Sequence, residues 1–374
     1  MSASVFFCGD IINMFSHKQF IGDNLRRVIQ SCDYAVGNLE GVINSENSVV
    51  KPMMQNRSTI NTLKEAGFNL LLLANNHIAD YRTERLSDTI AEIDEQGLSH
   101  IGAGTTYNDV YQTLTTTSKG IKIGFLNMCE AQVGHWDLGR KGFGYAWIGD
   151  IGISSRINEL RKNVDFVVAC VHGGLEHNTL PLPYFRQYYR MLCDMGVDCV
   201  VGSHPHIVQG IERYSNSLIF YSLGNFFFPR KPDSGKEDKE NSAFSVVVDF
   251  EKDKSIKYKV VHHSISDLTV ELEQNPIWDE EELSRMLLSP QYEHESEKML
   301  KEVYLQHVRP QLSYAMMGTE TSDTFLTKVK KIIKYLFFDY RATQLQRDKL
   351  LNRLVVNETY RSIIDTVTNQ SINK

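Results

Sequence analysis

The sequence predicts an α/β protein that contains a mixed β-sheet and ends in a helical extension. Up to about residue 270, short apolar runs rich in β-formers alternate with segments of helical periodicity, which is typical of a layered α/β domain. From Ala243 onward apolar side chains recur at every second position, which indicates antiparallel strands. After Pro276 the chain has no cysteine and few glycines, and its pattern is helical. We therefore expect two domains, at residues 1–275 and 276–374.

The strands and helices of the first domain follow from periodicity and from the turn residues that bound each run. Seven short apolar runs predict strands at 5–8, 34–36, 69–73, 122–126, 166–171, 199–201 and 218–222. Five segments between them repeat apolar residues at helical spacing, at 24–31, 59–66, 84–96, 154–162 and 184–195. Two later segments alternate apolar and polar residues, at 244–250 and 257–261, and predict antiparallel strands.

The second domain reads as three helical stretches that are separated by Pro290, Pro310 and Gly318. We expect this region to serve oligomerisation or the docking of a partner.

Composition and charge exclude several classes of protein. The 374 residues include 40 Lys plus Arg and 46 Asp plus Glu, so the net charge of −6 gives no attraction to nucleic acid, and we expect no nucleic-acid partner. The six cysteines form no Cys-x-x-Cys pair, which disfavours zinc ribbons and redox pairs. No apolar run reaches the length of a transmembrane helix, and the first residues do not read as a secretory signal, so we expect a cytoplasmic protein.

Polar motifs follow six of the predicted strands. Because the carboxyl ends of parallel strands meet at one edge of a sheet, we expect these side chains to converge. The motif residues that carry chemistry are Asp10, Glu40, Asn76 with His77, His172 with Glu176 and His177, His204 with His206, and Asn225.

Six of these residues form a set of metal-binding side chains. Aspartate, glutamate, asparagine and histidine together suit divalent Zn, Mn or Fe, and the lack of thiolates favours a catalytic over a structural metal. Glu40 could bridge two ions. Each residue also has a structural alternative: Asp10 and Asn76 could cap a turn or a helix, and Glu40 could cap the helix that follows it. The candidate metal ligands are Asp10, Glu40, Asn76, His172, His204 and His206.

The remaining motif residues point to substrate. His77 directly follows a candidate ligand, and we assign it as a general acid or transition-state stabiliser. Glu176, His177 and Asn225 are candidate substrate-binding residues, or groups that support the ligands.

In this order the motifs resemble the CapA-like family, also called the bacterial capsule synthesis or PGA_cap domain, which is related to the calcineurin-like metallophosphoesterases. The resemblance covers roughly residues 3–250. It implies a four-layered α/β/β/α sandwich with two divalent metal ions at the strand ends. On this resemblance Asp10 and His206 hold the first ion, Glu40 bridges, and the second ion is held by Asn76, His172 and His204.

One difference from the related metallophosphoesterases concerns the first motif. Those proteins have Asp-x-His there, whereas this chain has Asp10-Ile11-Ile12, so the first site lacks the histidine that this motif would supply.

The resemblance implies a metal-dependent hydrolase, of a phosphoester in the first instance, linked to capsule, polysaccharide or poly-γ-glutamate production. Its substrate would be a phosphorylated or capsule-related small molecule or polymer. Two alternatives stay open: an enzyme that hydrolyses or transfers a γ-glutamyl amide, and an assembly factor without catalysis.

Overall fold

The computed structural model describes most of the chain and divides it into two units. The described residues are 2–15, 19–44, 53–81, 83–132, 134, 142–229, 239–317, 324, 326–327, 329–330, 348–352 and 354–372. One unit comprises 1–130 and 134–289, and the other comprises 131–133 and 290–374. None of the helices formed by the described residues has the length and apolar character needed to cross a membrane.

An eight-stranded mixed sheet forms one inner layer of the larger unit. Its order is β18-β17-β16-β1-β2-β5-β6, and β15 also pairs with β1. The pairs among β1, β2, β5, β6 and β15 are parallel, whereas those of β16 with β1 and β17, and of β17 with β18, are antiparallel. The alternating segments were therefore predicted correctly as antiparallel strands. The strands are β1 (Ser2–Ile11), β2 (Tyr34–Leu39), β5 (Leu70–Leu72), β6 (Ser99–Ile101), β15 (Asn225–Phe227), β16 (Ser242–Glu251), β17 (Ile256–Ser266) and β18 (Thr269–Leu272).

A six-stranded sheet forms the second inner layer, in the order β13-β14-β12-β11-β9-β8. The pairs β9–β11, β11–β12 and β12–β14 are parallel. The strands are β8 (Leu114–Ser118), β9 (Ile121–Cys129), β11 (Phe166–His172), β12 (Cys199–Ser203), β13 (Ile211–Tyr214) and β14 (Ser217–Phe220). Two small pairs lie outside both sheets, formed by β3 (Val42–Asn44) with β4 (Met54–Asn56) and by β7 (Ala103–Gly104) with β10 (Gly144–Tyr145).

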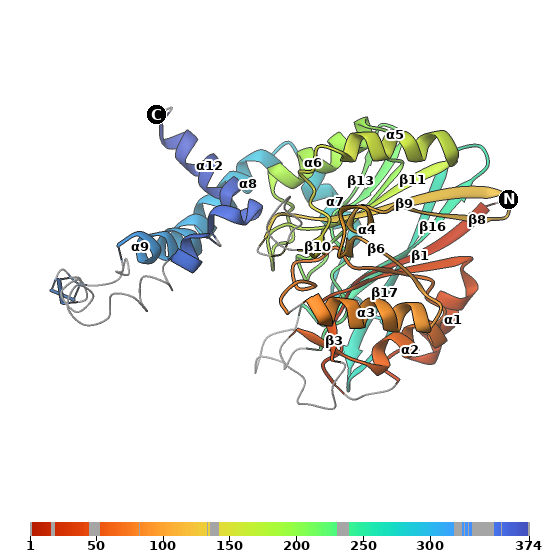
Figure 1. The fold of residues 1–374 in the computed structure, drawn as a ribbon. Coiled ribbons are helices and arrows are strands. Elements are labelled where there is room, and N and C mark those ends of the chain that lie inside the picture. The colour runs from red at the N-terminus through yellow and green to blue at the C-terminus, as the bar shows by residue number, and fades with distance from the viewer. Residues whose placement is uncertain are drawn as a thin grey trace. The chain divides into compact units, whose positions relative to one another are not determined.

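Helices cover the outer face of each sheet, which makes the four layers of an α/β/β/α sandwich and confirms the predicted fold class (Figure 1). The eight-stranded sheet is covered by α1 (Asp23–Ser31), α2 (Ser58–Ala66) and α3 (Thr83–Glu95). The six-stranded sheet is covered by α5 (Ile153–Asn163) and α6 (Pro183–Asp194). The short α4 (Tyr107–Val110) follows β7, and α7 (Glu280–Leu288) packs beside β13.

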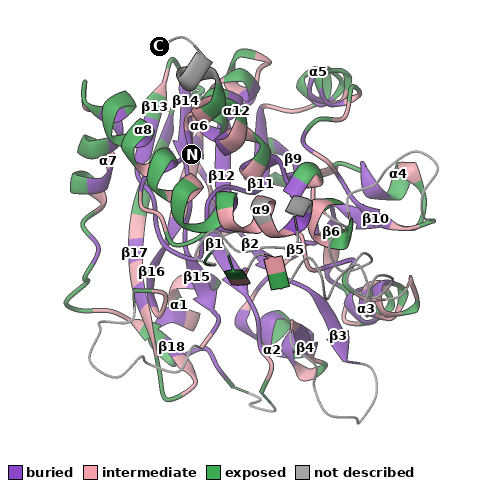
Figure 2. Ribbon diagram, turned by 90° about the vertical axis from the view of Figure 1, so that its left-hand side faces the viewer, coloured by how far each residue is buried: buried purple, intermediate pink, exposed green. Residues whose placement is uncertain are grey.

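The core lies between the two sheets, where their inward side chains interdigitate. Phe7 of the first sheet contacts Phe125 of the second, with ring centroids 6.4 Å apart, and Phe250 contacts Phe166 at 5.0 Å. Most strand residues are accordingly buried, whereas the helices bury only one side (Figure 2). Each such phenylalanine contributes about 2–3 kcal/mol by burial, so this apolar layer is the rigid base on which the loops at the strand ends are built.

The smaller unit is helical, as predicted for the C-terminal region. It contains α8 (Tyr292–Val303), the π-helical turn η1 (Tyr304–Val308), α9 (Arg309–Met317) and α12 (Glu358–Ile372). Pro310 does not separate two helices, because it lies in the first turn of α9. A proline has no backbone N–H to donate, and the π-helical turn that precedes α9 accommodates it. Gly318, the third expected separator, lies outside the described residues.

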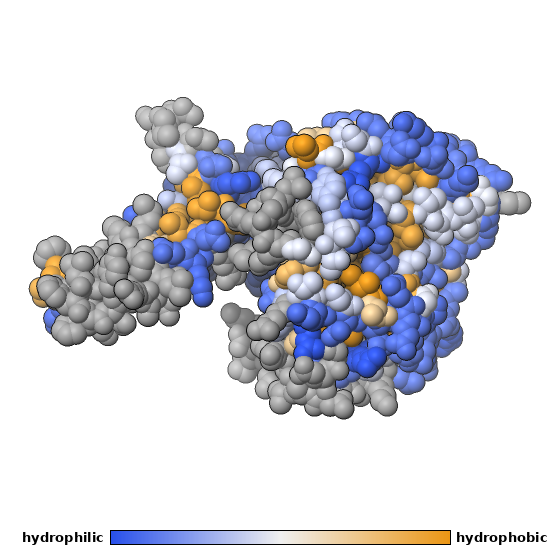
Figure 3. Space-filling model, in the orientation of Figure 1, coloured by the Kyte–Doolittle hydropathy of each residue, from blue (hydrophilic) through white to orange (hydrophobic). Residues whose placement is uncertain are grey.

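A short segment from the middle of the chain belongs to this helical unit. The backbone N–H of Ala131 donates to Glu358 Oε2 at 2.7 Å, and the N–H of Glu358 donates to the carbonyl of Ala131 at 3.1 Å. The unit also shows hydrophobic surface among its hydrophilic side chains (Figure 3). Its exposed hydrophobic residues include Leu305, Leu326 and Val355. The docking role expected for these helices stays a prediction.

Candidate metal centre

The loops that carry the predicted motifs meet at one end of the sandwich. They follow β1, β2 and β5 in one sheet, and β11 and β12 in the other, and in each sheet these strands are parallel neighbours. Their carboxyl ends therefore face the same edge. All six candidate ligands lie in this cluster, and all except Asn76 are buried.

A close approach between two backbone segments sets the position of Asp10. The N–H of Asp10 donates to the carbonyl of Gly224 at 3.1 Å, and Asp10 lies opposite Asn225 in the β1–β15 register. A Cβ atom on Gly9 would lie only 1.8 Å from that carbonyl oxygen, so only glycine fits there.

Asp10 is fully buried, and both of its carboxylate oxygens face groups of the cluster. Asn38 Nδ2 donates to Oδ1 at 2.7 Å, and the backbone N–H of His204 donates to Oδ2 at 3.1 Å. His172 Nδ1 lies 3.6 Å from Oδ1, and His206 Nδ1 lies 3.5 Å from Oδ2. Asp10 thus connects loops from both sheets and does not cap a helix or a turn.

Three of the candidate ligands point their donor atoms at one another. His172 Nε2 lies 3.0 Å from Asn76 Oδ1 and 3.1 Å from His204 Nδ1, and it lies 4.0 Å from Oε1 of Glu40. Donor atoms bound to one ion at about 2.1 Å are themselves separated by about 3 Å. The other nitrogen of His172, Nδ1, lies 3.0 Å from Ser203 Oγ, which fixes the ring so that Nε2 faces the cluster.

A second group of donor atoms comprises Asp10, Glu40 and His206, whose ligand atoms lie within 4.8 Å of one another. Asn225 is buried beside His206 and accepts a 2.9 Å hydrogen bond from its Nδ1. Its amide nitrogen donates to the carbonyl of Glu240. With these contacts Asn225 orients His206, and its expected contact with substrate stays a prediction.

The electrostatics of the cluster favour a bound cation. Burial lowers the pKa of His172 and His204 well below the usual 6.5 and lowers that of His206 to about 4, so all three imidazoles are neutral at pH 7 and able to coordinate a metal. The carboxylates of Asp10 and Glu40 are fully buried in the same place. Buried carboxylates are costly without a nearby positive charge, and neutral imidazoles provide none. The donor set therefore fits divalent metal ions.

The unusual backbone of this cluster also points to function. His204 has a φ of 99° and His206 a φ of 60°, which are conformations that residues other than glycine rarely adopt. Such conformations cost of order 1–3 kcal/mol each and concentrate at functional sites.

His77 lies beside the cluster and is held by a carboxylate of its own. Its Nδ1 forms a 2.6 Å hydrogen bond with Asp80 Oδ2, and its Nε2 lies 3.8 Å from Glu40 Oε1. The side chain is 27% exposed, whereas the candidate ligand histidines are almost completely buried. This position lets Nε2 reach a molecule that enters from solvent.

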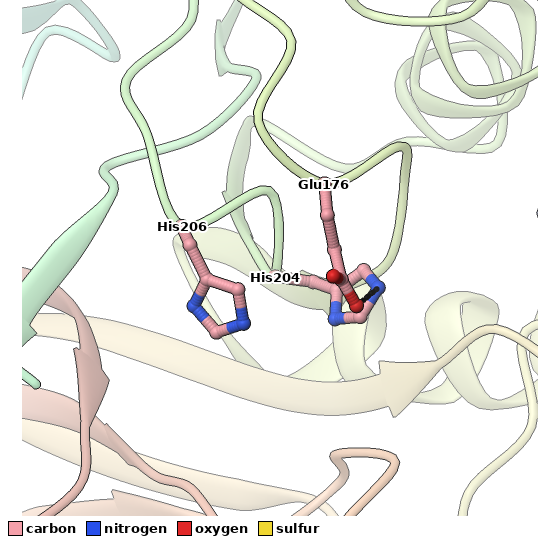
Figure 4. Close-up of side chains that lie close together, drawn as sticks. All are labelled: Glu176, His204 and His206. Atoms are coloured by element: carbon pink, nitrogen blue, oxygen red, sulfur yellow. Dashed lines mark ion pairs between the residues drawn. The ribbon is translucent and has the colours of Figure 1, made fainter. Parts of the chain in front are cut away.

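Glu176 and His177 lie at the solvent-facing edge of the cluster. The carboxylate of Glu176 lies 4.0 Å from His204 Nε2, and donor atoms of Glu176, His204 and His206 lie within 4.8 Å of one another (Figure 4). His177 Nδ1 faces Glu240 at 3.4 Å. Both side chains are half-exposed, so they are accessible to substrate and to ions.

More than half of the chain matches a known protein family. The bacterial capsule synthesis protein family PGA_cap matches residues 4–230. The chain belongs to the PGA_cap family. Curated relatives include the capsule biosynthesis protein CapA of Bacillus anthracis, which is 29% identical over 59% of this chain and 56% of the relative. The PGA biosynthesis protein CapA of Bacillus subtilis is 32% identical over 54% of each chain. This PGA_cap chain spans about half the length of these curated relatives.

Solved structures with a similar backbone have low sequence identity to this PGA_cap chain. One is described as a novel phosphatase from Mycoplasma pneumoniae, with a TM-score of 0.46 and 15% identity, covering 71% of this chain and 95% of that one. Another is the NAD nucleotidase of Haemophilus influenzae, with a TM-score of 0.43 and 11% identity, covering 93% of this chain and 60% of that one.

Two residues of the centre were not assigned from the sequence of this PGA_cap member. Glu130 is fully buried directly after β9, and its Oε1 lies 3.7 Å from His204 Nε2. It was missed because the predicted strand ended at residue 126, whereas β9 continues to Cys129. The other is Asn38, which donates to Asp10 from within the motif that contains Glu40. A carboxylate that directly follows a long apolar strand was the available signal for Glu130.

Proposed function

We propose that this PGA_cap protein is a metal-dependent hydrolase that cleaves a phosphoester with two divalent ions, of Mn, Zn or Fe. The observation that carries the proposal is a set of donors in two groups, each of which has a member close to Glu40. Asp10 and His206 belong to one group. Asn76, His172 and His204 belong to the other.

The two groups would each hold one ion, with Glu40 between them. When bound, the ions lower the pKa of coordinated water and stabilise negative charge on the phosphoryl group. The protein supplies the fixed geometry: Ser203 and Asn38 hold His172 and Asp10, and Asn225 holds His206. Since these supports are buried, little reorganisation is required when substrate binds.

His77 would protonate the leaving group. Asp80 binds Nδ1, which holds the ring so that Nε2 lies on the side of the centre, 3.8 Å from Glu40 Oε1. Glu176 and His177 are half-exposed at the edge of the cluster, where they would contact the substrate.

The names of the relatives support a link to capsule or poly-γ-glutamate production, because one is a capsule biosynthesis protein and another a PGA biosynthesis protein. We place the substrate of this chain in the same chemistry, as a phosphorylated precursor or polymer intermediate.

The test is a panel of phosphomonoesters and phosphodiesters, assayed after loading the purified protein with Mn, Zn or Fe. Turnover that is abolished in Asp10→Ala and in His204→Ala, with unchanged circular dichroism, would support the proposal. Turnover equal to wild type in both variants would remove the metal centre from the mechanism.

A second candidate reaction is hydrolysis or transfer at a γ-glutamyl amide, which the PGA biosynthesis name of one relative favours. Metal ions activate amides and phosphoesters in the same way, so the ligand set does not separate the two. Adding poly-γ-glutamate to the same panel does. A protein that binds metal but turns over neither class would instead support an assembly role, for which the isoleucine at position 12, where related enzymes have histidine, is the best argument.

A further inference from the structure

Glu176 lies in a loop whose backbone is fixed against the loop of the two clustered histidines. The N–H of Gly173 donates to the carbonyl of Ser203 at 3.0 Å, and the N–H of His177 donates to that of Pro205 at 2.9 Å. Gln209 Nε2 donates to the carbonyl of Asn178 at 2.8 Å. These three bonds connect the residues around Glu176 to the segment that contains His204 and His206, so the Cα of Glu176 has a defined position beside both imidazoles.

The conformation of this loop is unusual as well. His177 has a φ of 61° and Gly174 a φ of 125°. The left-handed conformation of His177 costs free energy, and the hydrogen bond to Pro205 helps to maintain it.

The carboxylate of Glu176 has two sets of neighbours. On the inner side, Oε1 lies 4.0 Å from His204 Nε2, within the donor group that includes His206 (Figure 4). On the outer side, Oε2 lies 3.7 Å from His177 Nε2. Half of the side chain is exposed, so it has room to rotate, and its 4.0 Å distance from His204 Nε2 is already close to the 3–4 Å separation of ligands around one ion.

We propose that Glu176 is a further metal ligand of this centre, on the side of His204 and His206 that faces solvent. The inference rests on the proposed metal-dependent function and deepens it, because it adds a carboxylate ligand to the centre on its solvent-facing side. An accessible carboxylate next to two buried neutral imidazoles provides the mixed oxygen and nitrogen ligands that Zn and Mn accept.

Glu240 offers a matched control. Its carboxylate lies 3.4 Å from Nδ1 of His177, so both glutamates flank the same imidazole. Only Glu176, however, belongs to the donor group with His204 and His206. Substituting either residue by glutamine removes one negative charge beside His177, and only Glu176→Gln removes a ligand.

The experiment compares wild type, E176Q, E240Q and E176D by isothermal titration with Mn²⁺ and by the visible absorption of the Co²⁺-loaded protein. We expect E176Q to lower the affinity of one Mn²⁺ equivalent at least about tenfold and to change the Co²⁺ spectrum. We expect E240Q to match wild type, and E176D to recover part of the affinity.

Two outcomes would overturn the assignment while leaving the metal centre intact. In the first, E176Q has the same Mn²⁺ affinity and the same Co²⁺ spectrum as wild type. In the second, E176Q and E240Q weaken Mn²⁺ binding equally, which would indicate a through-space effect of charge. A wild-type protein that binds no Mn²⁺ or Co²⁺ would overturn the proposed function itself, and the assignment of Glu176 with it.

Discussion

Asp10→Asn separates the role of Asp10 in metal binding from its role in the fold. In the metal-free protein, Asp10 and Glu40 are two buried carboxylates with oxygens within 4.8 Å, a repulsion of about 3.5 kcal/mol at an effective dielectric constant of about 20. The amide removes that repulsion. It also turns one hydrogen-bond acceptor into a donor that faces Asn38 or the N–H of His204, which costs about 1–3 kcal/mol. We therefore expect the metal-free variant to be as stable as wild type, or up to about 2 kcal/mol more stable.

In the presence of metal we expect wild type to be more stable than the Asp10→Asn variant. A cation at 100 times its dissociation constant stabilises wild type by about 2.7 kcal/mol, and the variant loses this gain at the site of Asp10. The assay is thermal unfolding followed by circular dichroism, in EDTA and in excess Mn²⁺, where 1 kcal/mol corresponds to about 2–4 °C. Asp23→Asn is the control, because Asp23 is 86% exposed and its loss should change neither condition by more than about 0.5 kcal/mol. A variant that unfolds far below wild type in EDTA, yet gains as much from Mn²⁺ as wild type does, would refute this reasoning.

Three further predictions concern other parts of the protein. His77→Ala should lower kcat about 10²–10⁴-fold at unchanged metal content, and Asp80→Asn should lower it less. Equal activity of wild type and both variants would exclude His77 as the general acid. Burial lowers the pKa of His263 to about 3, so on acidification the unfolded chain takes up a proton on this imidazole before the folded protein does. The free energy of unfolding should therefore fall by up to about 4 kcal/mol as the pH drops from 6.5 toward 3. In His263→Leu this free energy should depend less on pH, and the same pH dependence as in wild type would contradict the prediction. Gly9→Ala should lower the free energy of unfolding, measured by chemical denaturation, by about 2–4 kcal/mol and should also weaken metal binding. Gly142→Ala is the control, because Gly142 has open space around it, and this variant should resemble wild type. A Gly9→Ala protein with wild-type stability would show that the β1–β15 contact can relax.

The sequence predicted the layered fold and the cluster because both depend on local patterns. Long apolar runs such as 166–171 are recognisable as buried strands, and polar residues at their ends are brought together by parallel pairing without any knowledge of the loops. The alternation at 244–250 predicted the antiparallel β16 for the same reason.

Other features depend on tertiary structure and left no such pattern. The strand Leu114–Ser118 consists mainly of threonine and serine and was not predicted, because pairing with β9 rather than apolar alternation defines it. The π-turn that accommodates Pro310 and the positive φ of His204 are also invisible in the sequence. The distances between donor atoms, from which the role of Glu176 is inferred, arise only when loops from separate strands meet.

The most direct test of the central claim is the metal content of the chain, measured by inductively coupled plasma mass spectrometry on protein purified without chelator, with His204→Ala beside it. The account predicts close to two transition-metal ions per wild-type chain and a clear loss in the variant. No bound metal in wild type, even after reloading with Mn²⁺ or Zn²⁺, would contradict it.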